Sequence, residues 1–239
     1  MHIKNQLLCL FASSLMAMGF SAIAADKPKE LIKTVAVVEA RELPVGFDIS
    51  LGMWRHFVPF GVAGGVNENS SSFIAQAMPK IRAENYDPSG VLNRVIIKAL
   101  EDAGIKVLII KDLERSKYKP NKIRYPEIKH DADALMHLAI NYYVFELPRG
   151  QQLFWPRVDS WVSVYDKLGK NEILGTSASH SWEYKEGTDP GYFNVPQDMT
   201  FASEEAMAEN PKKFADIFNQ IMKAQAEHMV QDLLKKWPK

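Results

Sequence analysis

Residues 87–111 read DPSGVLNRVIIKALEDAGIKVLIIK, and this stretch decides the fold class. Asp87 and Pro88 are a typical helix start, and apolar residues then recur at helical spacing up to Ala103. Gly104 follows where a helix end favours a positive φ, and residues 106–111 predict a buried strand. Residues 34–39 (TVAVVE) predict an earlier strand, so the order strand, helix, strand indicates an α/β layer.

Three later segments alternate as long strands do, over residues 134–147, 157–166 and 172–184. Short turns join them, which predicts an antiparallel meander. The alternation places five residues of the first segment on one face: Met136, Leu138, Ile140, Tyr142 and Val144. The predicted fold class is α/β (α+β), a single domain over residues 25–239. Its mixed sheet has a C-terminal antiparallel meander, packed by helices 88–103 and 211–237.

Between the first strand and residue 87 the pattern is weaker. Residues 49–60 predict a short strand, and residues 73–81 predict a helical turn or two. The glycine-rich residues 61–65 and the polar run 67–72, which separate these two segments, indicate a loop.

The composition is that of a folded globular protein, with 46% hydrophobic residues among 239. The 29 Lys and Arg residues balance 29 Asp and Glu residues. Nucleic-acid binding by phosphate neutralisation needs a basic excess, so we do not expect a nucleic-acid partner.

Residues 1–24 have the anatomy of a cleavable signal peptide. An apolar stretch runs from Leu7 to Phe20, and Ala22 and Ala24 are the small residues that favour cleavage after Ala24. Cleavage after Ala25 is the alternative. Cys9 lies inside the apolar stretch without the context of a lipoprotein signal, so we expect no lipid anchor. The predicted location is the bacterial periplasm, with no transmembrane span after cleavage.

Catalytic and phosphate-binding motifs are incomplete. The sequence has no G-x-S-x-G elbow, its single cysteine falls in the signal peptide, and Ser70–Ser72 has no identifiable base. Residues 61–65 lack the Lys-Ser/Thr that completes a P-loop. We therefore predict no catalytic residues and no cofactor, although a site assembled from residues distant in sequence stays open.

One cluster, from His130 to His137, carries metal-binding residue types. On a helix these two histidines would stand about 10 Å apart, too far for one ion. On a strand, Asp131, Asp133 and His137 share a face. The simpler interpretation is a charged approach to a strand, and we predict no metal site.

Aromatic residues fall on the strand faces opposite the aliphatic ones, and others lie in loops. Either helices cover this second face or part of it is open for binding, because Trp and Tyr supply affinity with little loss of side-chain entropy. The candidate binding surface comprises Tyr143, Trp161, Tyr165, Trp182, Trp54, Phe57 and Phe60. The same alternation places His180 and Tyr184 beside this candidate surface.

Three segments together resemble a known envelope domain: ALEDAGIKVLIIKD (99–112), DADALMHLAINYYVFEL (131–147) and VDSWVSVYDKLGKNEILGTSASHSW (158–182). The pattern is similar to the α/β domain of small periplasmic envelope lipoproteins, of the curli-secretion lipoprotein and penicillin-binding-protein activator type. Asp133-Ala134-Leu135 and Asp166-Lys167-Leu168-Gly169 match its D-x-L and D-x-x-G positions. This chain lacks the lipobox of that group.

The resemblance implies a non-catalytic protein that binds another envelope component, an envelope protein being the expected partner. Two alternatives stay open. One is a periplasmic hydrolase with a site built from dispersed residues, and the other is a small-ligand-binding protein with residues 61–72 as a lid. The sequence assigns no oligomeric state.

Overall fold

The computed structural model describes residues 31–42, 72–111, 113–115, 121–148, 150–183 and 191–238, without the side chains of residues 72–76 and 143. Residues 32–237 form one unit around a six-stranded sheet in the order β2-β1-β3-β4-β5-β6. The strands are β1 (Thr34–Val38), β2 (Lys106–Ile109), β3 (Ala134–Glu146), β4 (Trp155–Asp166), β5 (Glu172–Ser181) and β6 (Tyr192–Asn194). The helices are α1 (Ser72–Ala83), α2 (Pro88–Asp102), α3 (Glu204–Glu209) and α4 (Pro211–Lys236), with short 3₁₀ turns η2 (Tyr125–Glu127) and η3 (Gln197–Met199).

The predicted fold class is confirmed, a mixed sheet packed by helices. β1 pairs in parallel with both β2 and β3, and β3, β4 and β5 form the antiparallel meander. Asp87 caps α2 by accepting a hydrogen bond from the Gly90 N–H at 3.0 Å, and Gly104 adopts φ +79° just after the helix. Both ends of this helix are therefore set by the residues that the sequence indicated.

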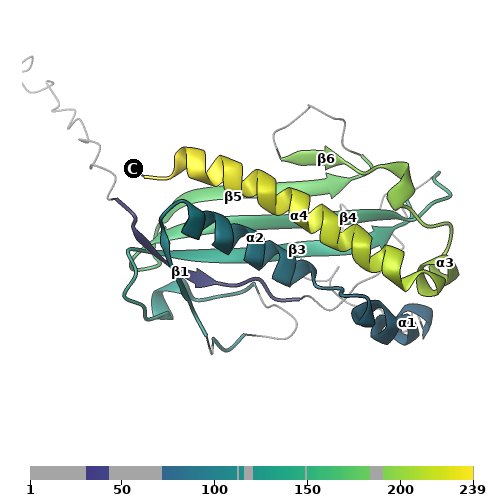
Figure 1. Cartoon of the computed structure of the whole chain (residues 1–239), viewed down its shortest axis with the longest axis horizontal. Helices are drawn as coiled ribbons and strands as arrows, with labels where there is room; N and C mark the ends of the chain where they lie inside the picture. The colour runs from purple at the N-terminus through teal and green to yellow at the C-terminus, as the bar shows by residue number, and fades with distance from the viewer. Residues whose placement is uncertain are drawn as a thin grey trace, which may run out of the picture. The chain divides into compact units, whose positions relative to one another are not determined.

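Helices α2 and α4 lie across one face of the sheet, as Figure 1 shows. The core between them and the sheet includes Phe145, Phe214 and Phe218, which are fully buried with ring centroids 5.2 Å apart in each pair. We call this side of the sheet the helix face and the opposite side the second face.

A β-bulge corrects one sequence prediction. The register of β3 against β4 shifts between Ile140 and Tyr142, because one extra residue is accommodated there. Up to Ile140 the alternation is as predicted, with Met136, Leu138 and Ile140 in the core under the helices. Beyond the bulge the faces exchange, so Tyr142 and Val144 pair with second-face residues of β4 and Phe145 enters the core instead.

The chain between β2 and β3 covers part of the second face. Val38 and Leu135 are buried there and pack against Ile123, Ile128 and Tyr125 of this connection. At β2, β1 and β3 the sheet is therefore covered on both faces, by helices on one and by this connection on the other.

Other elements differ from the sequence predictions in extent. α1 is a 12-residue helix rather than a turn or two, and β5 ends at Ser181 rather than residue 184. β6 and α3 are short elements that the sequence pattern did not indicate. The strand predicted within residues 49–60 lies outside the described residues.

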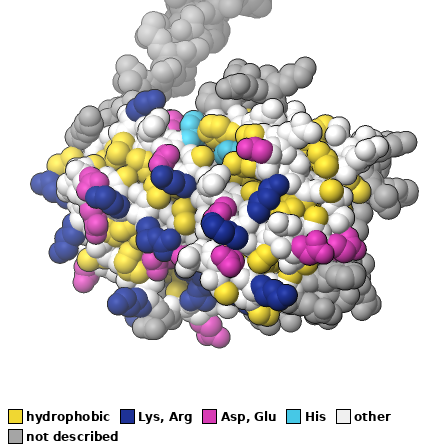
Figure 2. Space-filling model, turned by 45° about the vertical axis from the view of Figure 1, so that its right-hand side comes forward, with side chains coloured by type: hydrophobic (Ala, Val, Ile, Leu, Met, Phe, Trp, Pro, Cys, Tyr) yellow, Lys and Arg dark blue, Asp and Glu magenta, His cyan; other side chains and the backbone are white. Residues whose placement is uncertain are grey.

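None of the helices in the described part of the chain combines the length and apolar character needed to cross a bilayer. On the face seen in Figure 2, basic and acidic side chains are interspersed and no broad area carries one sign. This agrees with the balanced composition.

Candidate functional site

The second face carries an aromatic cluster formed by Tyr125, His137, Trp161 and Tyr165. Tyr125, from η2, stacks on Tyr165 with ring centroids 4.1 Å apart and planes at 26°. His137 meets the Trp161 ring edge-on at 4.9 Å. Trp161 and Tyr165 are only partly buried. The two predicted strand aromatics therefore share one face, but Tyr125 covers Tyr165, so this part of the face is not an open surface.

His137 is fully buried at the centre of this cluster, and its Nδ1 lies 2.9 Å from the Tyr125 hydroxyl. Burial, with a smaller effect of the Arg115 charge, lowers the pKa of His137 to about 3. The ring is therefore neutral near pH 7. The Nδ1 atom of His137 therefore has a hydrogen-bond partner, and this contact holds η2 against the sheet.

The other predicted surface residues are dispersed. Position 143 pairs with Val158, a core residue under the helices, so the β-bulge removes it from the row of Trp161 and Tyr165. The side chain of Tyr143 lies outside the described residues, as do Trp54, Phe57 and Phe60. Trp182 is partly buried in the turn after β5. His180, expected near the aromatic face, lies instead on the helix face opposite Val158.

The cluster from His130 to His137 makes structural contacts. Asp133 accepts hydrogen bonds from the backbone N–H groups of Lys33 and Thr34, at 3.0 and 2.8 Å, and so ties the start of β1 to β3. Among the residues that the structure describes, no three His, Cys, Asp or Glu side chains are grouped as metal ligands would be.

A buried polar network crosses the core between β4, β5 and α4. Ser160 Oγ donates to Gln225 Oε1 at 2.5 Å, and Gln225 Nε2 donates to the Val158 carbonyl at 2.8 Å and lies 3.1 Å from His180 Nδ1. Burial, and then the charge of His228, lower the pKa of His180 to about 4. The serine hydroxyl thus bonds to an amide rather than to a base, so the network stabilises packing and does not activate a nucleophile.

The free edge of β5 is the feature that sequence reasoning missed. The Ser179 N–H donates to the Gly191 carbonyl at 2.7 Å, at the point where β6 joins the sheet. Since hydrogen-bonding direction alternates along a strand, the backbone groups of Ser177 and Gly175 point to this same edge. Among the described residues, β6 pairs only with Ser179–Ser181. At Ser177, Gly191 already lies against the carbonyl oxygen, since a Cβ at Gly191 would stand 2.7 Å from it. We call the stretch Ile173–Thr176, which no described strand pairs on this side, the β5 edge.

Exposed apolar side chains occur in β5 and in the segments next to it in the sheet. Within residues 32–237, the large hydrophobic side chains that the structure describes as exposed are Leu168, Ile173 and Tyr192, at 63%, 43% and 40%. Leu168 lies in the β4–β5 hairpin, Ile173 in β5 and Tyr192 in β6. Exposed apolar residues beside unpaired backbone groups are typical of a surface that another chain covers.

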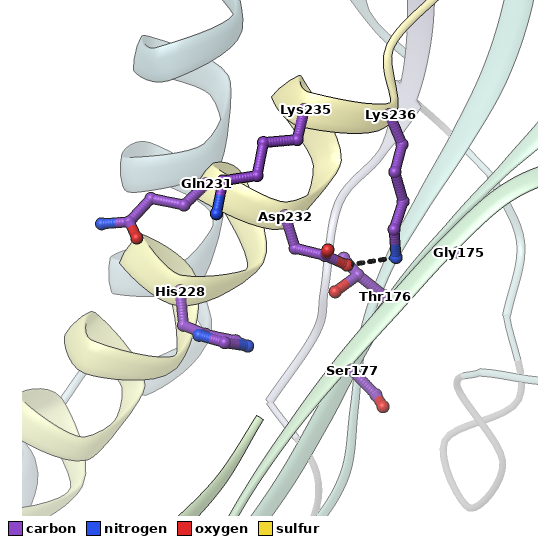
Figure 3. Close-up of a pocket in the computed structure, with 8 residues that line it drawn as sticks. All are labelled: Gly175, Thr176, Ser177, His228, Gln231, Asp232, Lys235 and Lys236. Atoms are coloured by element: carbon purple, nitrogen blue, oxygen red, sulfur yellow. Dashed lines mark hydrogen bonds and ion pairs between the residues drawn. The ribbon is translucent and has the colours of Figure 1, made fainter. Parts of the chain in front are cut away.

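A cavity of about 450 Å³ opens beside the β5 edge, between β5 and the last turns of α4 (Figure 3). Its lining is polar and consists of Gly175, Thr176, Ser177, His228, Gln231, Asp232, Lys235 and Lys236. Lys236 Nζ lies 2.6 Å from Asp232 Oδ2, and this pairing is the main cause that lowers the pKa of Asp232. A second hollow of about 400 Å³ lies further along the same side, between α4 and β6.

No family model matches the sequence, and neither does any curated protein. Two solved structures are similar in part. Protein XCC0632 from Xanthomonas campestris, of family DUF330, is 11% identical with a TM-score of 0.35, over 62% of this chain and 61% of that chain. Lipoprotein GNA1162 from Neisseria meningitidis is 14% identical with a TM-score of 0.31, over 61% of this chain and 80% of that chain. The chain thus spans about three fifths of the Xanthomonas protein, and the family resemblance stays a prediction.

Proposed function

We propose that this protein is an exported, non-catalytic accessory protein of the cell envelope that binds another envelope protein. The observation that supports this function best is the β5 edge. Gly175 directs its backbone groups outward there, next to the exposed side chain of Ile173 in the same strand. An unpaired strand edge with apolar neighbours is a template on which another chain can pair.

The location follows from the predicted signal peptide, residues 1–24. The polar groups of His137 and of the Ser160–Gln225 pair make hydrogen bonds inside the fold, which fits a structural role for them.

Photo-crosslinking in bacteria that export the protein tests this function. A photoreactive residue replaces Ile173 at the β5 edge, and separately Trp161 on the second face, with exposed Lys98 on α2 as the matched control. We expect one dominant envelope-protein adduct from position 173 and none from position 98. An adduct only from position 161 would keep the binding function but move it to the second face. The absence of a specific adduct from both positions would contradict the function.

A further inference from the structure

We propose that the hollow between α4 and β6 binds a small, uncharged carbonyl compound, whose oxygen accepts a hydrogen bond from Nε2–H of His180. This site goes beyond the proposed function, because its ligand is a small molecule and it shares no residue with the β5 edge. We call it the β6 hollow. Its volume is about 400 Å³, and its lining includes His180, Phe193, Met199, Gln220, Ile221 and Ala224.

The lining of the β6 hollow is largely apolar and uncharged. Phe193 from β6, Met199 from η3 and Ile221 from α4 belong to its apolar part. Asn194 and Gln220 add neutral amides. Among the described residues that line it, none is Asp, Glu, Lys or Arg, whereas the cavity beside the β5 edge has both acidic and basic ones. An ionised ligand would lose hydration here without gaining an opposite charge, so the lining favours an uncharged molecule.

The β6 hollow leads from the surface of α4 to the core. Gln220 and Ala224, one turn apart on this helix, are exposed and form its rim. Ile221 and His180 line it as well but are only 1% and 7% exposed. A ligand can therefore enter past the rim and reach buried side chains without opening the core.

His180 is the buried polar side chain at the inner end of this hollow. Its Nδ1 lies 3.1 Å from Nε2 of Gln225, within the core. Phe193 stacks on the imidazole with ring centroids 4.7 Å apart and planes at 17°. The core contact and the stacking together hold the ring in one orientation.

The hydrogen bonds of Gln225 determine which nitrogen of His180 carries the proton. Gln225 Oε1 accepts from the Ser160 hydroxyl, and Gln225 Nε2 donates to the Val158 carbonyl at 2.8 Å. The second proton of this amide is donated to His180 Nδ1, because an amide nitrogen offers two donors and no acceptor. A neutral imidazole that accepts at Nδ1 carries its own proton on Nε2. The ring is neutral near pH 7, since burial lowers the pKa of His180 to about 4.

Nε2–H of His180 has no acceptor among the described residues, whose hydrogen bond to this ring is the one at Nδ1. A donor left unpaired among apolar side chains costs free energy, and an acceptor atom in the hollow would remove that cost. A carbonyl oxygen on an otherwise apolar molecule supplies such an acceptor without adding charge. The shape, polarity and donor of the β6 hollow therefore point to the same class of ligand.

The test titrates the purified, isotope-labelled protein with acetophenone and, separately, with ethylbenzene, in which a CH₂ group replaces the carbonyl. By NMR we expect acetophenone to shift the Phe193, Asn194 and Ala224 amides saturably, with a Kd in the low millimolar range. Ala224→Leu places a larger side chain at the rim and should weaken the binding of both probes by about tenfold or more. Lys223→Leu, at the exposed neighbouring position outside the lining, should leave both affinities unchanged.

A second variant tests the hydrogen bond. His180→Phe keeps an aromatic ring against Phe193 but removes the donor. The affinity for acetophenone should fall by about fivefold, and the affinity for ethylbenzene should stay within about twofold. In the unmodified protein, the NMR shifts of the His180 ring nitrogens should show the proton on Nε2, and this measurement does not depend on the folding of a variant.

Four results would each overturn the inference. They are the absence of saturable acetophenone binding at these amides, an unchanged affinity in Ala224→Leu, equal losses for both probes in His180→Phe, and a proton on Nδ1 of His180. Crosslinking from position 173 tests the proposed function separately, so failure of the one is distinguishable from failure of the other.

Discussion

The hydroxyl of Tyr125 lies 2.9 Å from Nδ1 of the fully buried His137, and this contact joins the connection between β2 and β3 to the centre of the sheet. Burial is the largest cause that raises the pKa of Tyr125 above its usual value, so the phenol keeps its proton at neutral pH. A protonated phenol donates to Nδ1 of a neutral imidazole. The second face is therefore closed at this point by a hydrogen bond as well as by ring stacking on Tyr165.

Replacing Tyr125 with Phe removes that hydrogen bond and leaves Nδ1 of His137 buried without its partner. We expect the free energy of unfolding in urea to fall by about 1 to 3 kcal/mol. Lys122→Ala, an exposed change on the same connection, should leave it within about 0.5 kcal/mol. Equal stability of Tyr125→Phe and the unmodified protein would show that the contact contributes nothing.

Stability should decrease on mild acidification. The pKa values of His137 and His180, about 3 and about 4, lie below the value of about 6.5 that histidine has in an unfolded chain. Between these values the unfolded chain binds more protons than the folded one, so the free energy of unfolding falls as pH falls through 6.5. Each histidine contributes at most about 1.4 kcal/mol per pH unit.

Urea unfolding at pH 7.5 and pH 5.5 measures this decrease while the carboxylates stay ionised. In His137→Asn, which keeps an acceptor but cannot titrate, the decrease should be smaller. An identical decrease in both proteins would mean that His137 does not account for it.

Gln225→Leu should be strongly destabilising, because Ser160, the Val158 carbonyl and His180 all lose a hydrogen-bond partner in the core. We expect a loss of about 2 to 4 kcal/mol in unfolding free energy. Gln231→Leu, on an exposed position of the same helix, is the matched control and should change it little. A similar effect of both substitutions would refute the role given to the network.

Two glycines with positive φ should respond differently to alanine. At Gly169 (φ +64°) a Cβ would lie 2.7 Å from the Tyr125 carbonyl carbon, whereas at Gly104 (φ +79°) it would have no neighbour within 4 Å. Gly104→Ala should cost about 1 kcal/mol for the backbone conformation alone. Gly169→Ala should cost at least about twice that, since it also displaces η2, and calorimetric unfolding would rank the two.

Local signals in the sequence predicted most of the fold. The Asp87 cap, the apolar helix face and Gly104 define α2 through contacts within a few residues, and the alternation of residues 157–166 reflects one buried face. The extra residue between Ile140 and Tyr142 was not predictable from alternation, because a bulge depends on how the partner strand pairs.

The candidate site could be predicted only in part. Trp161 and Tyr165 share the second face as their spacing indicates, but their cover, Tyr125, comes from a segment 40 residues away from Tyr165. Nothing in the sequence marks the β5 edge, because residues such as Gly175 fit an edge strand and a central strand equally well. Among the described residues, β6 pairs with β5 only at Ser179–Ser181, and strand order is a property of the whole sheet.

Amide hydrogen exchange of the free protein tests most directly the central claim, that β5 keeps an open edge for a partner. NMR would compare Gly175, which points outward, with Leu174 and Thr176, which pair with β4. We predict rapid exchange at Gly175 and slow exchange at Leu174 and Thr176. Equally slow exchange at all three amides would contradict the account, because the β5 edge would then already be occupied in the free protein.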